Sequence, residues 1–232
     1  MKTDLNYIKK LLRKFSYLYQ YHFLVKPKMS KVVKQVLSGF TFTIRPTVFN
    51  PADFVSSKVF ASFINTLDLS GKHILDMGSG SGIVSIFAAS RGANCVACDI
   101  NPVAVRCIAE NALQNNLSAQ IKVYESDLFE SLKNNLVGKG FDIIFFNPPY
   151  YRGNPRNNFE RAFKGGPGLE VIDRFLMAAR SHLASGGKLC MIVSTDMDID
   201  DLYFRLEKAG YSYKILQTNK KFFETFYIIE AL

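Results

Sequence analysis

Long apolar runs, histidine and cysteine are all scarce in this sequence of 232 residues, and each shortage excludes a class of protein. No apolar run approaches the length that crosses a bilayer, and the opening MKTDLNYIKKLLRKF lacks the continuous apolar segment of a secretory signal. We therefore expect a cytoplasmic protein without a membrane partner. An organelle presequence is the alternative for so basic a start, but such presequences are rich in Arg and Ser rather than Lys.

The few histidines and cysteines do not combine into a metal or redox site. The three histidines, His22, His73 and His182, are scattered along the chain. Cys95 and Cys98 form a CxxC, a spacing used in redox and zinc sites, yet the four cysteines give no second CxxC. The surrounding ANCVACDI has the pattern of a strand, in which residues three apart point to opposite faces. We expect small buried apolar residues here and predict no metal ion.

Acidic residues are nearly absent from the first fifty positions. These hold ten Lys or Arg against Asp4 alone, whereas residues 51–232 hold 19 of each sign, so the net charge of +9 lies in the N-terminal part. One set of residues recurs there at helical spacing, namely Leu5, Ile8, Leu12, Phe15, Tyr19 and His22. The pattern predicts an amphipathic helix with a basic face, followed by a second helix over residues 30–37 that stops at Gly39. We expect residues 1–38 to form a basic helical arm and residues 39–232 to form one domain.

Strand and helix patterns alternate along the rest of the chain. FTFTI at residues 40–44 alternates like a strand, and residues 51–67 have a helical pattern. Seven further strands are expected over residues 72–77, 93–100, 119–127, 141–146, 186–195, 211–218 and 221–232, and helices over residues 82–91, 102–116, 169–183 and 199–210. This order predicts an α/β fold with a Rossmann-like, seven-stranded, mostly parallel sheet and helices on both faces. The last two strands, joined by Asn219 and Lys220, should form a C-terminal antiparallel hairpin.

A glycine-rich loop, LDMGSGSG at residues 75–82, follows the first of these strands and opens a helix. Glycines let the backbone approach a ligand closely. A dinucleotide-binding fingerprint would place its third glycine at position 83, which is Ile83. The observed spacing of Gly78, Gly80 and Gly82 after Asp76 resembles the first motif of Rossmann-like methyltransferases that use S-adenosylmethionine.

Acidic residues at the ends of the next two strands support that reading. Asp99 lies about twenty residues beyond the loop, where a carboxylate can accept hydrogen bonds from both ribose hydroxyls. Asp127 could accept one from the adenine amino group, and Asp76 suits the cationic methionine end. The plain alternative is that these acids cap helices or turns. The expected cofactor residues are Asp76, Gly78, Ser79, Gly80, Gly82, Asp99, Ile100, Asp127, Leu128 and Asn147.

The stretch FFNPPYY at residues 145–151 places two prolines directly after an apolar strand. Pro148 and Pro149 have no N–H, so the turn offers acceptors without competing donors. Asn147 precedes a proline and is therefore biased toward an extended conformation. Its side-chain oxygen and the Pro148 carbonyl can converge on one NH2 group, and the ring of Tyr150 can stack on a planar target.

Asn-Pro-Pro-Tyr in this place resembles the catalytic motif of methyltransferases that act on planar amino groups, either of adenine or of a glutamine side chain. The expected catalytic residues are Asn147, Pro148, Pro149 and Tyr150. Further along, FKGGPGLEVIDRFL at residues 163–176 resembles the HemK/PrmC-type glutamine methyltransferases, as do DINPVAV and VFNPADF. The resemblance implies S-adenosylmethionine as cofactor and, as substrate, the glutamine of a Gly-Gly-Gln loop in a peptide-chain release factor.

Two other functions compete with this one. An adenine-N6 methyltransferase acting on RNA or DNA would use the lysines and tyrosines of the arm to contact phosphates and bases. Cations beside the catalytic motif would add to that surface, at Arg152, Arg156, Arg161 and Lys164. The basic arm could equally be a solvated face or dock on the ribosome or an acidic partner. A catalytically silent binding scaffold is disfavoured because Asn147 is intact.

Overall fold

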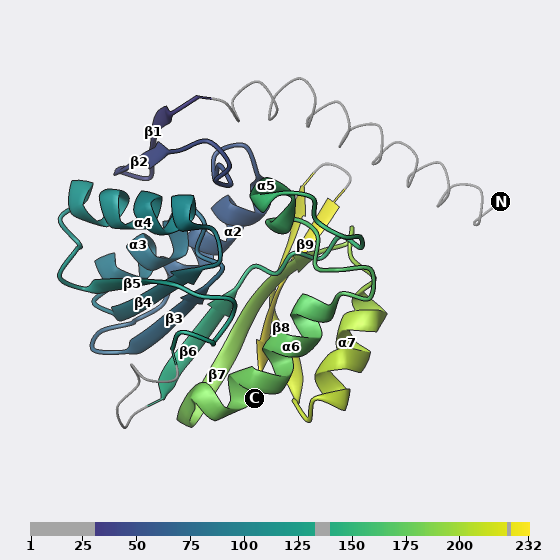
Figure 1. The fold of residues 1–232 in the computed structure, drawn as a ribbon. Coiled ribbons are helices and arrows are strands. Elements are labelled where there is room, and N and C mark those ends of the chain that lie inside the picture. The colour runs from purple at the N-terminus through teal and green to yellow at the C-terminus, as the bar shows by residue number, and fades with distance from the viewer. Residues whose placement is uncertain (1–30, 133–139, 222–223) are drawn as a thin grey trace.

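A seven-stranded sheet forms the centre of the molecule (Figure 1). The computed structural model describes residues 31–132, 140–221 and 224–232. The strand order is β5-β4-β3-β6-β7-β9-β8. The strands are β3 (His73–Met77), β4 (Asn94–Asp99), β5 (Ile121–Glu125), β6 (Phe141–Phe146), β7 (Leu183–Ser194), β8 (Tyr213–Lys221) and β9 (Glu224–Ala231). Strands β3 to β7 pair in parallel, while β9 is antiparallel to β7 and β8. The predicted sheet and its C-terminal hairpin are confirmed.

Helices cover both faces of the sheet, as predicted. One face packs against α2 (Val55–Ile64), α3 (Ile83–Ser90) and α4 (Pro102–Gln114). The other packs against α6 (Glu170–Ala179), its 3-10 extension η3 (Arg180–His182), and α7 (Ile199–Lys208). Successive residues of one strand alternate between the two cores, so Ile74 joins the first and Leu75 the second, both fully buried.

The cysteines follow this alternation. Cys95 lies in the first core and Cys98 in the second, so the CxxC side chains point to opposite faces as predicted. All four cysteines are free and buried, and burial raises the pKa of the Cys107 thiol to about 11. The thiols are therefore protonated and unreactive at neutral pH. In the part of the chain that the structure describes, no helix has the length and apolar character to span a membrane.

The helix predicted over residues 30–37 is wrong. Residues 33–37 form β1 (Val33–Leu37), which pairs antiparallel with β2 (Phe40–Ile44). The two-residue connection has positive φ at both positions, 48° at Ser38 and 88° at Gly39, which is the twist that a tight hairpin needs. Burial alternates along β1, and Val33 and Leu37 pack against the first core. Alternation with a period of two fits a strand and not a helix.

Two boundary predictions can be compared with this fold. The division at residue 38 falls inside the β1–β2 hairpin, so β1 pairs with the domain that follows it. The amphipathic helix predicted over residues 5–22 lies outside the described residues. The predicted hairpin turn at Asn219 and Lys220 is wrong, because both residues belong to β8 and pair with Phe226 and Thr225. The ladder simply continues further than the turn-forming residue Asn219 suggested.

Candidate active site

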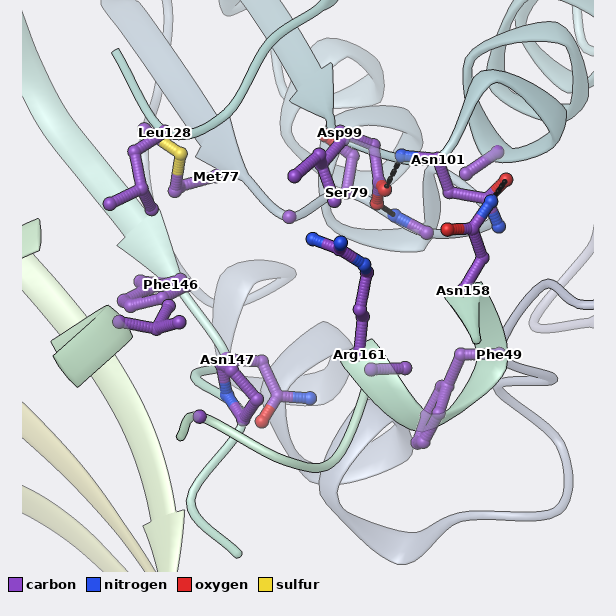
Figure 2. A pocket seen from close by; sticks show the side chains of 18 of the residues that line it. Phe49, Met77, Ser79, Asp99, Asn101, Leu128, Phe146, Asn147, Asn158 and Arg161 are labelled. Carbon is purple, nitrogen blue, oxygen red and sulfur yellow. Dashed lines mark hydrogen bonds between the residues drawn. The ribbon is translucent and has the colours of Figure 1, made fainter. Parts of the chain in front are cut away.

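A pocket of about 450 Å³ lies at the carboxyl ends of the parallel strands, where open α/β sheets bind their ligands (Figure 2). The loops after β3, β4, β5 and β6 each contribute to its wall. The predicted site residues that line it are Asp76, Gly78, Ser79, Gly80, Asp99, Ile100, Asp127, Leu128, Asn147 and Pro149. Gly82, Pro148 and Tyr150 are outside this lining. The fold thus brings four separate sequence segments to one cavity.

The glycine loop owes its shape to three positive φ angles, 65° at Gly78, 56° at Gly80 and 82° at Gly82. A Cβ added at Gly82 would lie 3.1 Å from Cγ2 of Ile108, so this glycine allows α3 to pack closely on α4. The loop amides bond within the protein: Ser79 N–H donates to the Cys98 carbonyl at 3.0 Å, and Gly82 N–H donates to the Ser79 carbonyl at 2.8 Å. Its backbone donors are largely committed before any ligand binds.

Asp99 ends β4 with a carboxylate in a fixed orientation. One oxygen accepts from Gly80 N–H at 2.8 Å and the other from Asn101 N–H at 2.8 Å. Burial raises the pKa of Asp99, and the backbone hydrogen bonds oppose that change. The glycine loop and the start of α4 therefore both converge on this one side chain.

Asp76 is 3% exposed, at the end of β3. Its Oδ2 accepts from Ser85 N–H at 3.0 Å and from the Ser85 hydroxyl at 2.6 Å. Burial raises the pKa of Asp76 to about 7, with a smaller contribution from the charge of Asp99, while Ser85 lowers it. A cation in the pocket would favour the ionised form. Sequence reasoning missed Ser85, because its position inside a predicted helix gave no sign of this contact.

Asp127 follows β5 and forms an ion pair with Arg174 of α6, at 3.1 Å between Oδ2 and Nη2. Arg174 also lies 3.3 Å from Glu130. Next to Asp127, Leu128 has a φ of 52° and its carbonyl accepts from the Ser126 hydroxyl at 2.7 Å. Asp127 and Leu128 form the pocket wall after β5. The ion pair with Arg174 and the hydrogen bond from Ser126 hold this turn in place.

The Asn-Pro-Pro-Tyr segment leaves β6 at the floor of the pocket, where the Asn147 side chain can be seen at the cavity (Figure 2). Pro148 is buried. Tyr150 packs against the second core, and its hydroxyl lies 3.4 Å from the hydroxyl of Ser194. Downstream, Tyr151 donates from its hydroxyl to Asp196 at 2.7 Å and from its N–H to the Phe163 carbonyl at 2.8 Å. The motif is thus anchored immediately beyond the residues that reach the pocket.

Residues 152–168, here called the strap, cross the pocket and carry α5 (Asn158–Arg161). The buried carboxylate of Glu160 organises the strap. It accepts from the Arg156 backbone N–H and Nε at 2.9 Å each, from Arg156 Nη2 at 2.5 Å, and from Lys164 Nζ at 2.9 Å. These hydrogen bonds lower the pKa of Glu160 to about 2. The sequence prediction missed this acid, although its two cationic partners lie four residues before and four residues after it.

Comparison with known families gives a match to the methyltransferase small domain over residues 39–225. The chain belongs to the methyltransferase small domain family. A relative from Methanocaldococcus jannaschii, provisionally named protein N5-glutamine methyltransferase, is 34% identical over 201 residues, which cover 84% of this chain and 96% of the relative. Methyltransferase HEMK2 of Mus musculus is 32% identical over 172 residues, which cover 70% of this chain and 79% of that protein.

Solved structures of methyltransferases share the fold. The 16S rRNA methyltransferase RsmC of T. thermophilus, in complex with AdoMet and guanosine, has a TM-score of 0.66 at 21% identity and covers 87% of this chain and 50% of that one. Mtq2 of E. cuniculi, in a Mtq2–Trm112 complex described as methylating the termination factor eRF1, has a TM-score of 0.60 at 24% identity and covers 80% and 98%. This methyltransferase is therefore an S-adenosylmethionine-dependent enzyme.

The pocket of the methyltransferase fits its cofactor chemically. S-adenosylmethionine carries a sulfonium and an ammonium, and the wall offers the carboxylates of Asp76, Asp99 and Asp127. The volume is within the range of small-molecule sites, about 300–1,000 Å³. Several lining residues were absent from the sequence prediction, namely Thr47, Phe49, Asn101, Asn158 and Glu170, and Arg161 was predicted only as a possible nucleic-acid contact. Phe49 lies in VFNPADF, a segment that carries the family resemblance. The resemblance gave Phe49 itself no role in the pocket.

Proposed function

We propose that this methyltransferase transfers a methyl group to the side-chain amide nitrogen of a glutamine in a cytoplasmic protein substrate. The observation that supports the proposal most is the position of Asn147 at the floor of the cofactor pocket, directly after β6 and before two prolines. One relative named for glutamine methylation and one named HEMK2 match this chain along 96% and 79% of their own length.

In this proposal each acidic residue of the pocket wall binds a different part of the cofactor. Asp99 accepts from the ribose hydroxyls, Asp127 faces the adenine amino group beside Arg174, and Asp76 faces the cationic methionine end. Ser79, Gly78 and Gly80 allow close approach of the backbone, and Ile100 and Leu128 contact the base. S-adenosylmethionine supplies an electrophilic methyl group when bound.

The chain's own residues act on the nucleophile. A glutamine amide nitrogen is a weak nucleophile because its lone pair is delocalised into the carbonyl, which gives such bonds a rotation barrier of about 18–20 kcal/mol. Asn147 Oδ1 and the Pro148 carbonyl would accept one hydrogen each, raise electron density on nitrogen and orient it for in-line attack. Pro149 keeps the turn free of donors, and Tyr150 would stack on the amide. The extra proton leaves to solvent after transfer.

The substrate class we favour is a peptide-chain release factor, the substrate that the sequence resemblance implies. Adenine in RNA or DNA is the alternative, and the strap weakens its support. Of the four cations that suggested nucleic-acid contact, Arg156 and Lys164 are bound to Glu160, and Arg152 pairs with Asp201 at 2.8 Å. Paired cations neutralise fewer phosphates.

The test is transfer of labelled methyl from S-adenosylmethionine into a methylation-naive cell extract, followed by protease or nuclease treatment. Loss of label with protease, and labelling of a purified release factor at glutamine, are the expected results. Loss with nuclease would overturn the glutamine assignment in favour of adenine, and no transfer at all would leave the scaffold alternative. The variant Asn147→Ala should abolish transfer, whereas its affinity for the cofactor should fall far less, because Asp76, Asp99 and Asp127 remain. The control is Asn94→Ala, because Asn94 begins β4 and therefore lies at the end of the strand far from the pocket.

A further inference from the structure

The anionic end of the cofactor poses a problem for this pocket. The methionine end carries a carboxylate as well as an ammonium, while the described wall is rich in acids, with Asp76, Asp99, Asp127 and Glu170. A carboxylate placed among carboxylates needs a cation or a set of amide donors.

The glycine loop is a poor source of amide donors. Ser79 N–H, Gly80 N–H and Gly82 N–H donate to the Cys98 carbonyl, to Asp99 and to the Ser79 carbonyl, at 2.8 to 3.0 Å. At the start of α3, Ser85 N–H donates to Asp76. These donors would have to break existing hydrogen bonds before they could bind an anion. A side-chain cation is therefore the better candidate.

Three cations line the described part of the pocket: Arg161, Lys164 and Arg174. Lys164 is 2.9 Å from Glu160, and Arg174 is 3.1 Å from Asp127. Arg161 forms no ion pair with any residue that the structure describes, and it is exposed. Figure 2 shows its side chain extending from α5 into the cavity, toward the side where Ser79 and Asp99 lie. Among the described cations of the pocket, Arg161 is thus the one whose charge is still available.

The strap holds α5 so that Arg161 faces the cavity. The Asn157 side chain caps the helix by accepting from Glu160 N–H at 2.9 Å. Asn158 Nδ2 lies 3.4 Å from Asn101 Oδ1, which ties α5 to the loop that also orients Asp99. Glu160, which directly precedes Arg161, instead pairs with Arg156 and Lys164. Neighbouring positions on a short helix point in different directions, so this arrangement separates Arg161 from the carboxylate beside it.

We propose that Arg161 binds the carboxylate of the cofactor's methionine end. This assignment rests on the proposed function, since it assumes that the pocket is the cofactor site. A guanidinium presents paired N–H donors in a planar fork that matches a carboxylate, and such charge-assisted pairs are stronger than neutral hydrogen bonds. Arg161 is then a binding residue that selects for an intact methionine end. It leaves the reacting nitrogen to the Asn147 side of the pocket.

The experiment is calorimetric titration of the full chain with S-adenosylmethionine and with decarboxylated S-adenosylmethionine, which keeps the sulfonium and ammonium but lacks the carboxylate. Arg161→Met should weaken binding of the first ligand by about tenfold to a hundredfold. It should leave binding of the second within about threefold. Arg106→Met removes another exposed arginine, on α4, that does not line the pocket, and it should change neither affinity. Arg161→Lys, which keeps the charge without the fork, should recover part of the loss.

Each other result has a defined meaning. An unchanged affinity of Arg161→Met for S-adenosylmethionine would overturn the assignment. So would an equal loss for both ligands, because the arginine would then act on the adenosine half or on the fold. A wild-type chain that binds neither ligand would refute the proposed function itself, and the assignment would fall with it. Thermal unfolding of both methionine variants separates lost binding from lost folding.

Discussion

Asp99 is the residue at which the cofactor assignment can be tested most directly, because its carboxylate is fixed by two backbone hydrogen bonds at the edge of the pocket. Asp99→Ala should weaken binding of S-adenosylhomocysteine by roughly a hundredfold, as expected for the loss of charged hydrogen bonds. Asp99→Asn keeps an acceptor in place and should lose less. Calorimetry reports both, with Asp68→Ala, an exposed acid, as the control. Equal affinity of Asp99→Ala and wild type would remove Asp99 from the site.

Asp76 predicts a pH dependence of stability in the free enzyme. Its pKa is raised from 3.8 to about 7 by burial, so between these values the folded state binds a proton that the unfolded state has lost. This contribution to stability is present in full below pH 3.8 and falls as pH rises toward 7. Between pH 5 and pH 7 wild type should therefore lose about 2 kcal/mol of unfolding free energy more than Asp76→Asn. Urea unfolding at both pH values measures this, and parallel losses in the two proteins would contradict it.

At the scale of elements, buried amides join α4 to the β1–β2 hairpin. Asn111 is fully buried, accepts from Thr43 N–H at 2.7 Å, and donates to the Thr43 carbonyl at 3.1 Å and the Ser81 carbonyl at 2.9 Å. Asn111→Ala would leave these backbone groups without their partner and should lower the free energy of unfolding by about 2–4 kcal/mol. Because Ser81 lies in the pocket lining, cofactor affinity should fall as well.

Denaturant unfolding measures the first effect and calorimetry the second. Asn94→Ala, at an exposed position, is the matched control and should change stability by less than about 0.5 kcal/mol. If Asn111→Ala were as stable as this control, the amide would not be what holds β2 on α4.

The same hairpin shows why the sequence predicted some elements and not others. The strand–helix repeats are long and strongly patterned, and the glycine loop and FFNPPYY follow strands by position. The fold could therefore be predicted, and most of the predicted site residues do line the pocket. Residues 30–37 are short, and their valines fit either pattern until Ser38 and Gly39 are recognised as a turn with positive φ. Contacts such as Asp76 with Ser85 join residues nine positions apart through the path of the backbone and leave no periodic signal.

At the scale of the whole molecule, the end of the basic N-terminal segment and the start of the folded domain do not coincide. The basic excess is spread over the first fifty residues, yet pairing with the domain begins at Val33. A protein that begins at residue 31 keeps both strands of the hairpin. A protein that begins at residue 39 lacks β1, and with it the packing of Val33 and Leu37 on the core. The shorter protein should lose about 1–3 kcal/mol of unfolding free energy relative to the longer one.

Both truncated proteins also test what the basic arm binds. Removing residues 1–30 deletes seven Lys or Arg and one acid, so two-thirds of the net charge goes with them while the hairpin stays. If this arm contacts nucleic acid, binding to RNA should be lost in both proteins and should be salt-sensitive in the full chain. Retained RNA binding after removal of residues 1–30 would exclude the arm as its source. If the proteins that begin at residues 31 and 39 had equal free energies of unfolding, β1 would pair with β2 without stabilising the domain. The domain boundary would then lie at residue 38, as predicted.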